Sequence, residues 1–407
     1  MRPKAFELLE RRDFRRLYLA VAISELGDSF HYIALMWIAL VMGGPLGVIA
    51  VRLADSIPAL VFGFHGGIAA DKWNRKHLMV AADLTRAIVL IPVAIAGLTG
   101  KLPLWGLVVA AFLLETATSY FAPAYGATVP TLVDRANVQE ANGLVTSTAN
   151  ALSIGGWAAA AGLLAILPIS AFFALNSLSF FASAFFISGI VSGDRVGAAD
   201  GQAQPRVREA FSAMRPHKAL TSGVVVLAIA ITISAGTWIT GVPELVRNVI
   251  HRDAGGYSIV MVGYAIGSIL AGALLARFPI NNKPRASLLA WILYLPGYGM
   301  FALSTSLPMA VAGSMLAAIG QSAALILLTS AAQESIRDEA LGRVMGLISL
   351  VHRGAHATGL ILISPLFAVF ATRSLFALAA VAISATGIAG AMLSISTATG
   401  RLTEPAN

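Results

Sequence analysis

The sequence predicts an all-α membrane protein whose chain crosses the bilayer twelve times. Of its 407 residues, 57% are hydrophobic and only 12% are charged, whereas soluble domains average about 45–50% and about 25%. Apolar runs of the roughly 20 residues that a membrane helix requires recur along the whole chain. A soluble fold of this composition would expose more apolar surface than solubility allows.

Twelve apolar segments of suitable length follow one another from the N-terminus. The first comes directly after a basic stretch and, at roughly 27 residues, exceeds the apolar region of about 7–15 in a cleavable signal peptide. We therefore expect it to remain as the first transmembrane helix. The expected spans are 16–42, 46–70, 77–98, 103–123, 142–166, 168–190, 219–242, 256–277, 285–305, 307–330, 343–368 and 374–396.

The longest connection lies between the sixth and seventh spans and divides the chain in two. Residues 191–218 begin with a Gly, Ala and polar stretch that is typical of a linker. They continue as VREAFSAMRPHKAL, which is suited to a short helix on the membrane surface. We expect an N-terminal six-helix bundle over 1–190, a cytoplasmic linker over 191–218 and a C-terminal six-helix bundle over 219–407.

The placement of Lys and Arg predicts the orientation. If both termini lie on one side, about 21 of the 28 basic residues fall on that side. Lys and Arg concentrate in cytoplasmic loops, so both termini are predicted to be cytoplasmic. Three basic residues fall inside spans, and the few on the far side are Lys101, Arg247, Arg252 and Arg373.

Composition excludes several classes of function. The net charge of +8 comes from short basic clusters between apolar runs, not from a basic stripe interleaved with aromatics, so we expect no nucleic-acid partner. The chain has no cysteine, which rules out disulfides and thiolate metal sites. The expected partners are the lipid bilayer, protons and a small-molecule substrate, and we expect a monomer.

Ionisable residues deep in the apolar spans are the candidate functional residues. The segment VAISELGDSFHYIALMWIAL at 21–40 contains Glu25, Asp28 and His31, which lie within about 120° of arc on one helix face. An ionised side chain at the bilayer centre costs about 2.5–3.5 kcal/mol on insertion scales, so such groups face protein or a water-filled cavity. Asp28 lies roughly 18 Å along the helix from Arg16, near the midplane.

Other spans add to this set. Arg52 and Asp55 share a helix face at i, i+3 and are suited to pair. Glu115 lies roughly 18 Å from the start of the fourth span. The eleventh span contributes His352, Arg353 and His356. Trp157 in the fifth span either lines a cavity or packs between helices.

The histidines at 352 and 356 permit three interpretations. Two histidines at i, i+4 resemble a metal pair, but a zinc site needs at least three protein ligands, so we expect neither metal nor cofactor. Polar packing between helices is the second interpretation. Handling of a proton or substrate is the third, because histidine titrates near neutral pH.

The loop after the second span, GGIAADKWNRKHLM at 66–79, resembles the signature loop of the major facilitator superfamily. Asn74 stands where many members carry glycine. Further strings resemble the branch of bacterial drug/proton antiporters that includes macrolide efflux proteins and the enterobactin exporter. Those strings are SELGDSF, RLADSIPAL, DLTRA, FAPAYGATVPTLV, EANGL and DEALGRVMGL. The residues that match the loop are Gly67, Asp71, Lys72, Arg75 and Lys76.

The resemblance implies two six-helix bundles around a central cavity that opens alternately to either side. Spans one, two, four and eleven would border this cavity, and spans three, six, nine and twelve would lie outside it. Asp71 would form part of a cytoplasmic gate with the start of the eleventh span; the alternative is a topology anchor without a role in switching. Asp83 and Arg86 in the third span would brace the signature loop.

The resulting expectation is a bacterial inner-membrane exporter, not an enzyme, that exchanges protons for a small amphipathic drug or secondary metabolite. Asp28 is the favoured proton-coupling residue, with Glu25 and Glu115 as further candidates; the alternative for Asp28 is a permanent ion pair with Arg52. The alternative substrate is an anionic siderophore or metabolite bound by Arg52, Arg353 and histidine. A metal-dependent intramembrane enzyme or a non-transporting sensor is remote. The expected substrate-cavity residues are His31, Arg52, Asp55, Trp157, His352, Arg353 and His356.

Overall fold

A computed structural model of the chain describes residues 7–134, 137–191, 207–278 and 280–399. Within these residues the structure is helical, with no strand. The chain divides into two compact units, residues Met1–Gln202 and Ala203–Asn407. Of the expected linker, 192–206 lies outside the described residues, and the expected surface helix corresponds to α7, Val207–Met214.

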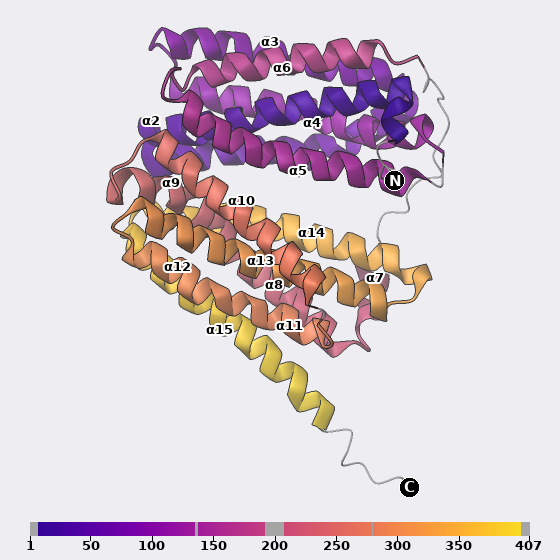
Figure 1. Ribbon diagram of the computed structural model, residues 1–407, viewed down its shortest axis with the longest axis vertical. Helices are drawn as coiled ribbons and strands as arrows, with labels where there is room; N and C mark the ends of the chain where they lie inside the picture. The colour runs from indigo at the N-terminus through magenta and orange to yellow at the C-terminus, as the bar shows by residue number, and fades with distance from the viewer. Residues whose placement is uncertain (1–6, 135–136, 192–206, 279, 400–407) are drawn as a thin grey trace. The chain divides into compact units, whose positions relative to one another are not determined.

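The N-terminal unit contains one short 3-10 helix and five α-helices. Helix α2 packs against α4, α5 and α6, and α3 packs against α4 and α6, so each helix has at least one apolar neighbour (Figure 1). The bounds are η1 Leu8–Glu10, α2 Arg12–Lys72, α3 Arg75–Leu98, α4 Leu104–Leu132, α5 Val138–Leu163 and α6 Ala171–Ser188.

Helix α2 holds the first two predicted spans, 16–42 and 46–70, on either side of a kink. Gly44 has φ 59° and ψ −153° there, which interrupts the helical conformation inside the 61-residue element. Glycine adopts positive φ without the steric cost that a Cβ atom imposes. Pro45 follows directly and has no N–H to continue the helical hydrogen bonding. The sequence GGP therefore places the turn between the two spans.

The C-terminal unit begins with α7 and then forms a long apolar segment containing two π-helical turns. This segment, from Lys218 to Val249, comprises the predicted seventh span. Helix α8 packs against α14 and α15, while α13 packs against α10, α11 and α12. The bounds are α8 Lys218–Gly236, η3 Thr237–Gly241, α9 Val242–Glu244, η4 Leu245–Val249, α10 Ala254–Arg277, α11 Lys283–Ala290, η5 Trp291–Leu293, α12 Tyr294–Leu303, α13 Leu307–Ser335, α14 Asp338–Leu362, η6 Ser364–Ala368 and α15 Thr372–Thr399.

Helices of membrane-spanning length and hydropathy occur in both units. Among the described residues there are 10 such segments, and the one from Arg12 to Gly63 includes the kink at Gly44. The fifth predicted span falls in α5, which is not one of the 10. The all-helical membrane fold is confirmed, whereas the number of twelve spans and the cytoplasmic termini stay predictions.

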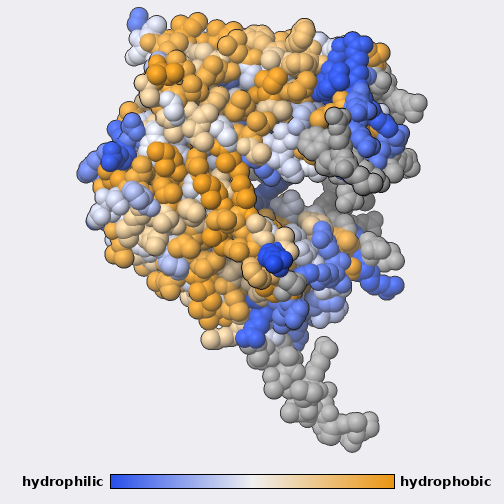
Figure 2. Space-filling view, in the orientation of Figure 1, coloured by the Kyte–Doolittle hydropathy of each residue, from blue (hydrophilic) through white to orange (hydrophobic). Residues whose placement is uncertain are grey.

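The helix surfaces are apolar, as a lipid environment requires. Hydrophobic residues cover much of the visible helix sides, and hydrophilic residues gather at helix ends (Figure 2). Phe185 is 74% exposed and Leu393 is 66% exposed. Exposed apolar surface of this extent is typical of membrane contact, not of a soluble monomer.

Candidate functional site

A polar pocket of about 220 Å³ lies inside the N-terminal unit. Helices α2, α3, α4 and α6 supply its lining, and most of the lining side chains are ionisable or polar. The structure thereby brings together five predicted site residues from the first, second and fourth spans. The lining residues are Asp28, His31, Tyr32, Leu35, Arg52, Asp55, Arg86, Leu114, Glu115, Thr118, Asn176 and Phe180.

Asp28 is held by a neutral donor on α6. Asn176 Nδ2 donates to Asp28 Oδ1 at 3.1 Å, and Ser179 Oγ donates to Asn176 Oδ1 at 2.9 Å, which fixes the direction of the amide. A Cβ atom at Gly27 would lie 2.1 Å from Ser179 Oγ. Only glycine permits this approach of α2 to α6, so the Gly27-Asp28 pair of the sequence positions the carboxylate against Asn176.

The second predicted span carries its own ion pair. Arg52 Nη1 lies 2.5 Å from Asp55 Oδ2, and the side chains are 22% and 27% exposed. The i, i+3 spacing predicted this pairing, because such residues are neighbours on one helix face. Asp28 has no ion pair with Arg52 in the described structure, so the alternative interpretation of Asp28 as the fixed partner of Arg52 is not supported.

Arg86 lines the pocket, and the expectation that Asp83 and Arg86 brace the signature loop stays a prediction. Its guanidinium forms a buried ion pair with Asp83 and lies 4.5 Å from the ring centroid of Phe121 and 4.2 Å from that of Phe180. Ser183 Oγ donates to Asp83 at 2.6 Å. The aromatic rings over the guanidinium hold Arg86 in the core of the unit, where it lines the pocket.

Two further predicted residues line the pocket with unused hydrogen-bonding capacity. Glu115 has no side-chain hydrogen bond or ion pair within the described residues, although it faces the same space as Asp28 and Arg52. His31 packs its ring against Phe173 at a centroid distance of 5.4 Å and an angle of 63°. Its buried Nδ1 has no hydrogen-bond partner in the described structure.

Glu25 and Trp157 lie elsewhere in the N-terminal unit. Ser153 Oγ on α5 donates to Glu25 Oε1 at 2.6 Å, and Glu25 does not line the pocket that contains Asp28. Trp157 is half-buried, and its indole Nε1 has no hydrogen-bond partner within the described residues. Of the polar stripe predicted on the first span, Asp28 and His31 therefore share the pocket and Glu25 does not.

The signature loop is fixed by capping and by backbone contacts. Asn74 caps α3 by accepting a hydrogen bond from His77 N at 3.0 Å, a role that glycine cannot fill with a side chain. Arg75 is buried and donates to Ala70 O at 3.2 Å and Ala127 O at 2.9 Å. Lys76 Nζ donates to Ile190 O at 3.1 Å.

The remaining loop residues are less constrained. Asp71 and Lys72 are exposed, and a Cβ atom at Gly67 would meet nothing within 4 Å. Their predicted role as a gate stays a prediction.

The predicted residues of the eleventh span lie in α14 of the C-terminal unit. The rings of His352 and His356 contact each other edge-on, with centroids 4.8 Å apart and an angle of 64°. Arg353 is exposed. Within the described residues, no group of three or more His, Asp or Glu side chains is arranged to hold a metal ion.

Sequence reasoning missed the contribution of the third and sixth spans to the pocket. Asn176 and Phe180 come from α6, and Arg86 comes from α3, although both spans were expected to lie outside the central cavity. Asn176 was detectable, because it is the one side-chain amide in the apolar run of α6. Tyr32 and Thr118 gave no comparable signal.

The fold and the polar pocket define a multi-pass membrane transporter. The family described as transmembrane secretion effector matches residues 4–405. The chain belongs to this family of the major facilitator superfamily; it is a transporter of the inner membrane and not an enzyme.

Relatives of known class agree with an efflux transporter. Macrolide efflux protein A of Streptococcus pyogenes is 25% identical over 368 residues, covering 87% of this chain and 89% of the relative. The Enterococcus faecalis protein of the same name is 25% identical over 329 residues, covering 78% of this chain and 100% of the relative. The putative bacilysin exporter BacE of Bacillus subtilis is 26% identical over 308 residues, covering 73% of this chain and 74% of that protein.

Solved structures show the same fold at low sequence identity. A point mutant of the nucleoside transporter NupG superposes with a TM-score of 0.71 at 13% identity, covering 94% of this chain and 99% of the other. A bacterial homologue of the iron transporter ferroportin gives a TM-score of 0.68 at 14% identity, covering 95% and 98%. These similarities concern the fold alone.

Proposed function

We propose that this protein is a proton-coupled exporter of a small amphipathic drug or secondary metabolite that carries a basic group. The observation that supports the proposal is the state of the two carboxylates Asp28 and Glu115. Both line one pocket, and neither forms an ion pair in the described structure. Among the described residues, the recorded donor to Asp28 is the neutral amide of Asn176.

A carboxylate without a fixed cation is suited to exchange. Neutralising it by a proton or by a substrate cation leaves no buried partner charge unpaired, whereas breaking a buried ion pair costs about 3–5 kcal/mol. Proton and cationic substrate would therefore compete for Asp28. Competition of this kind couples proton entry to substrate release, which is the requirement of an antiporter.

The pairing of the arginines favours a basic substrate over the anionic alternative. Arg52 already pairs with Asp55, and Arg86 pairs with Asp83. An anionic siderophore would have to displace one of these carboxylates, while a basic group would meet Asp28 and Glu115 unpaired. Arg353 is exposed on α14 of the C-terminal unit.

In the proposed cycle the two six-helix bundles alternate access to the substrate, with both termini cytoplasmic and Asp71 at the cytoplasmic gate. Asp28 carries the proton, and Glu115 provides a second carboxylate for the substrate. Glu25, hydrogen-bonded by Ser153, becomes a positioning residue between α2 and α5. His352, His356 and Trp157 remain candidates for contact with the substrate. The monomer is the proposed functional form.

The proposal is tested in inverted vesicles that carry the protein. Addition of a transported weak base should dissipate an imposed pH gradient, and Asp28→Asn should abolish that response. Glu115→Gln should weaken it and raise the substrate concentration needed for half-maximal response. Glu140→Gln, which changes an exposed carboxylate at the start of α5, is the matched control and should behave as wild type.

Other results separate the parts of the proposal. If Asp28→Asn exports normally while Glu25→Gln or Glu115→Gln fails, the proton is carried by another carboxylate. Normal coupling in all three variants would exclude the carboxylate mechanism. A response to weak acids, but not to weak bases, would reverse the assigned charge of the substrate.

A further inference from the structure

We infer that each unit binds one anionic phospholipid in a groove between the start of its first long helix and the end of its last. The two grooves have volumes of about 380 Å³ and about 810 Å³. Each groove joins basic side chains to an apolar wall, which matches the phosphate and the acyl chain of one lipid molecule. The inference goes beyond the proposed transport activity and does not depend on it.

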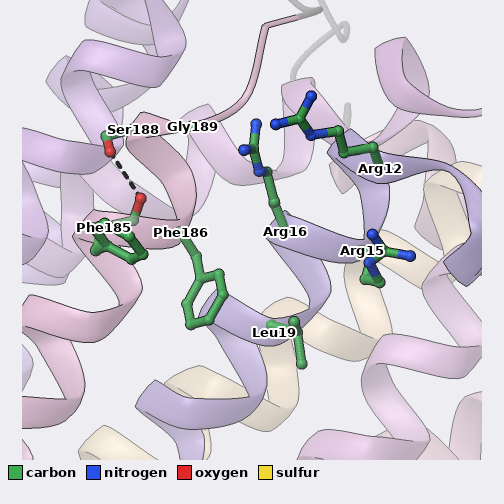
Figure 3. Close-up of a pocket in the computed structure, with 8 residues that line it drawn as sticks. All are labelled: Arg12, Arg15, Arg16, Leu19, Phe185, Phe186, Ser188 and Gly189. Carbon is green, nitrogen blue, oxygen red and sulfur yellow. Dashed lines mark hydrogen bonds between the residues drawn. The ribbon is translucent and has the colours of Figure 1, made fainter.

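The N-terminal groove is lined by the start of α2 and the end of α6 (Figure 3). Arg12, Arg15 and Arg16 come from the first turns of α2. In the view of Figure 3, the guanidinium groups of Arg12 and Arg16 lie at one end of the groove, and Phe186 and Leu19 lie toward the other. The polar end is therefore separated from the apolar end along the helix.

The basic side chains at the polar end of the groove are not all paired with acidic groups among the described residues. Arg16 Nη1 lies 3.9 Å from Asp13 Oδ1, and Asp13 Oδ2 also accepts from Val191 N at 3.2 Å. Arg15 Nη1 donates to Leu9 O at 3.4 Å. Arg12 has no ion pair within the described part of the chain. Among the described residues, Arg16 therefore has a carboxylate within 4 Å, whereas Arg12 and Arg15 have no recorded ion pair. A phosphate diester would supply the anionic partner.

The C-terminal groove repeats this arrangement between α7, α8 and α15. Arg215, which directly follows α7, and Lys218, the first residue of α8, are exposed. Neither has an acidic partner among the residues that the structure describes. The face continues through the hydroxyl of Ser222 to Val225 and Ile229, which are 49% and 44% exposed. From Lys218 to Ile229 the helix rises roughly 16 Å, so charge, hydroxyl and apolar side chains follow in the order of a phospholipid.

The two grooves occupy the same position in the chain order of their units. In each, basic residues lie on or just before the first turns of a long apolar helix, and apolar residues lie one to three turns further along. The last helix of each unit supplies the opposite wall, with Phe185 on α6 and Leu393 on α15. Two independent occurrences in one chain indicate a shared ligand.

The apolar walls select a lipid over a free anion. Phe185 and Leu393 are 74% and 66% exposed on helices long and apolar enough to span a membrane, where acyl chains are the available apolar partner. Basic residues near the membrane surface attract anionic lipids. A water-soluble phosphate would contact the basic side chains and would not cover the exposed apolar walls.

Native mass spectrometry of the full-length protein in detergent tests the inference. With phosphatidylglycerol we expect two retained lipids per chain, and fewer with phosphatidylcholine of the same acyl chains. Arg12→Gln/Arg16→Gln and Arg215→Gln/Lys218→Gln should each lose one lipid. Each basic side chain near the membrane surface raises the affinity for an anionic lipid about fivefold, so each double variant should bind its lipid roughly 25- to 30-fold more weakly.

Controls keep the result interpretable. Arg277→Gln/Arg285→Gln removes the same charge from exposed residues outside both grooves and should keep both lipids. Arg16→Lys and Lys218→Arg should keep binding and report on the sites if a glutamine variant fails to fold. Leu393→Gln leaves the charges in place and should weaken only the lipid of the C-terminal groove.

Four outcomes would overturn the inference. The first two are equal retention of phosphatidylglycerol and phosphatidylcholine, and equal loss of lipid in the Arg277→Gln/Arg285→Gln control. The third is undiminished lipid binding in both groove variants. The fourth is displacement of the lipid by inorganic phosphate or glycerophosphoglycerol at the concentration at which phosphatidylglycerol binds. The last would show that the grooves take a soluble anion instead.

Discussion

The two units bury different chemistry. In the described structure the buried charged side chains are Arg75, Asp83 and Arg86, and all three belong to the N-terminal unit. The buried polar residues of the C-terminal unit are serines and threonines. Its largest fully buried side chains are aromatic: Trp291, Tyr257, Tyr294, Tyr298, Phe301 and Phe376.

The aromatic cluster of the C-terminal unit is satisfied by neutral hydrogen bonds. Tyr294 Oη donates to Gln321 Oε1 at 2.6 Å, and Tyr298 Oη donates to Ser234 O at 3.2 Å. The rings of Tyr298 and Phe376 contact edge-on at 5.3 Å. Burial of such an aromatic cluster stabilises the fold, and the cluster contains no group that titrates near neutral pH.

This difference agrees with different roles for the two units. Buried charge is costly in a membrane helix and is retained where it has a use, which agrees with the proposal that Asp28 and Glu115 of the N-terminal pocket take part in transport. The C-terminal unit provides a closely packed support. Four substitutions, ordered from the largest to the smallest expected change in stability, test this contrast.

Asp83→Asn should cause the largest loss of stability. Arg86 would remain buried without its carboxylate partner, which costs about 3–5 kcal/mol in the free energy of unfolding. Thermal unfolding in detergent measures the change. Ser384→Ala is the C-terminal control, because Ser384 Oγ donates to Trp291 O at 3.3 Å and a neutral hydrogen bond contributes about 1 kcal/mol. Equal effects of the two substitutions would contradict the contrast.

Tyr298→Phe should lower the free energy of unfolding by about 1 kcal/mol, because it removes one neutral hydrogen bond and keeps the ring contacts. The pH dependence of transport in vesicles should not change, because the hydroxyl of Tyr298 takes no part in the proposed proton exchange. A shifted pH profile with unchanged stability would place proton chemistry in the C-terminal unit and break the comparison.

Asp134→Asn should have a smaller effect, which is present at neutral pH and disappears in acid. Arg11 donates a hydrogen bond to Asp134 and holds the pKa of that carboxyl below its usual value of 3.8. The pair therefore stabilises the fold above pH 3.8, and this contribution is lost as the pH falls through the lowered pKa. Both side chains are exposed, so high salt should reduce the difference.

The measurement for this pair is the thermal midpoint of wild type and Asp134→Asn at neutral and acidic pH. The two proteins should differ at neutral pH and converge in acid. A difference that grows as the pH falls would have the wrong sign.

His31→Phe should leave stability unchanged or slightly increased. The buried Nδ1 has no hydrogen-bond partner among the described residues, so replacing the imidazole removes an unsatisfied polar atom. Phenylalanine keeps the ring contact with Phe173. Transport assays then separate structure from function: reduced export by a protein of normal stability would assign His31 to the substrate or proton, and normal export would leave it with packing alone.

The local features of the fold could be predicted from the sequence. Apolar length predicted the helices, Gly44 and Pro45 marked the kink in α2, and the i, i+3 spacing predicted the Arg52–Asp55 pair. The shared helix face of Asp28 and His31 was also correct. Each of these depends on residues within a few turns of one another, where helix geometry fixes the relative positions.

The sequence by itself determined that this chain is a helical membrane transporter and which of its apolar segments carry ionisable residues. Tertiary structure alone decided that Asn176, 148 positions from Asp28, supplies its hydrogen bond, and that Arg86 lies at the pocket between two aromatic rings. Partners on different helices depend on which helices pack together and in what rotation. Helical periodicity specifies the face that a residue occupies, but it carries no information about the neighbour which that face meets.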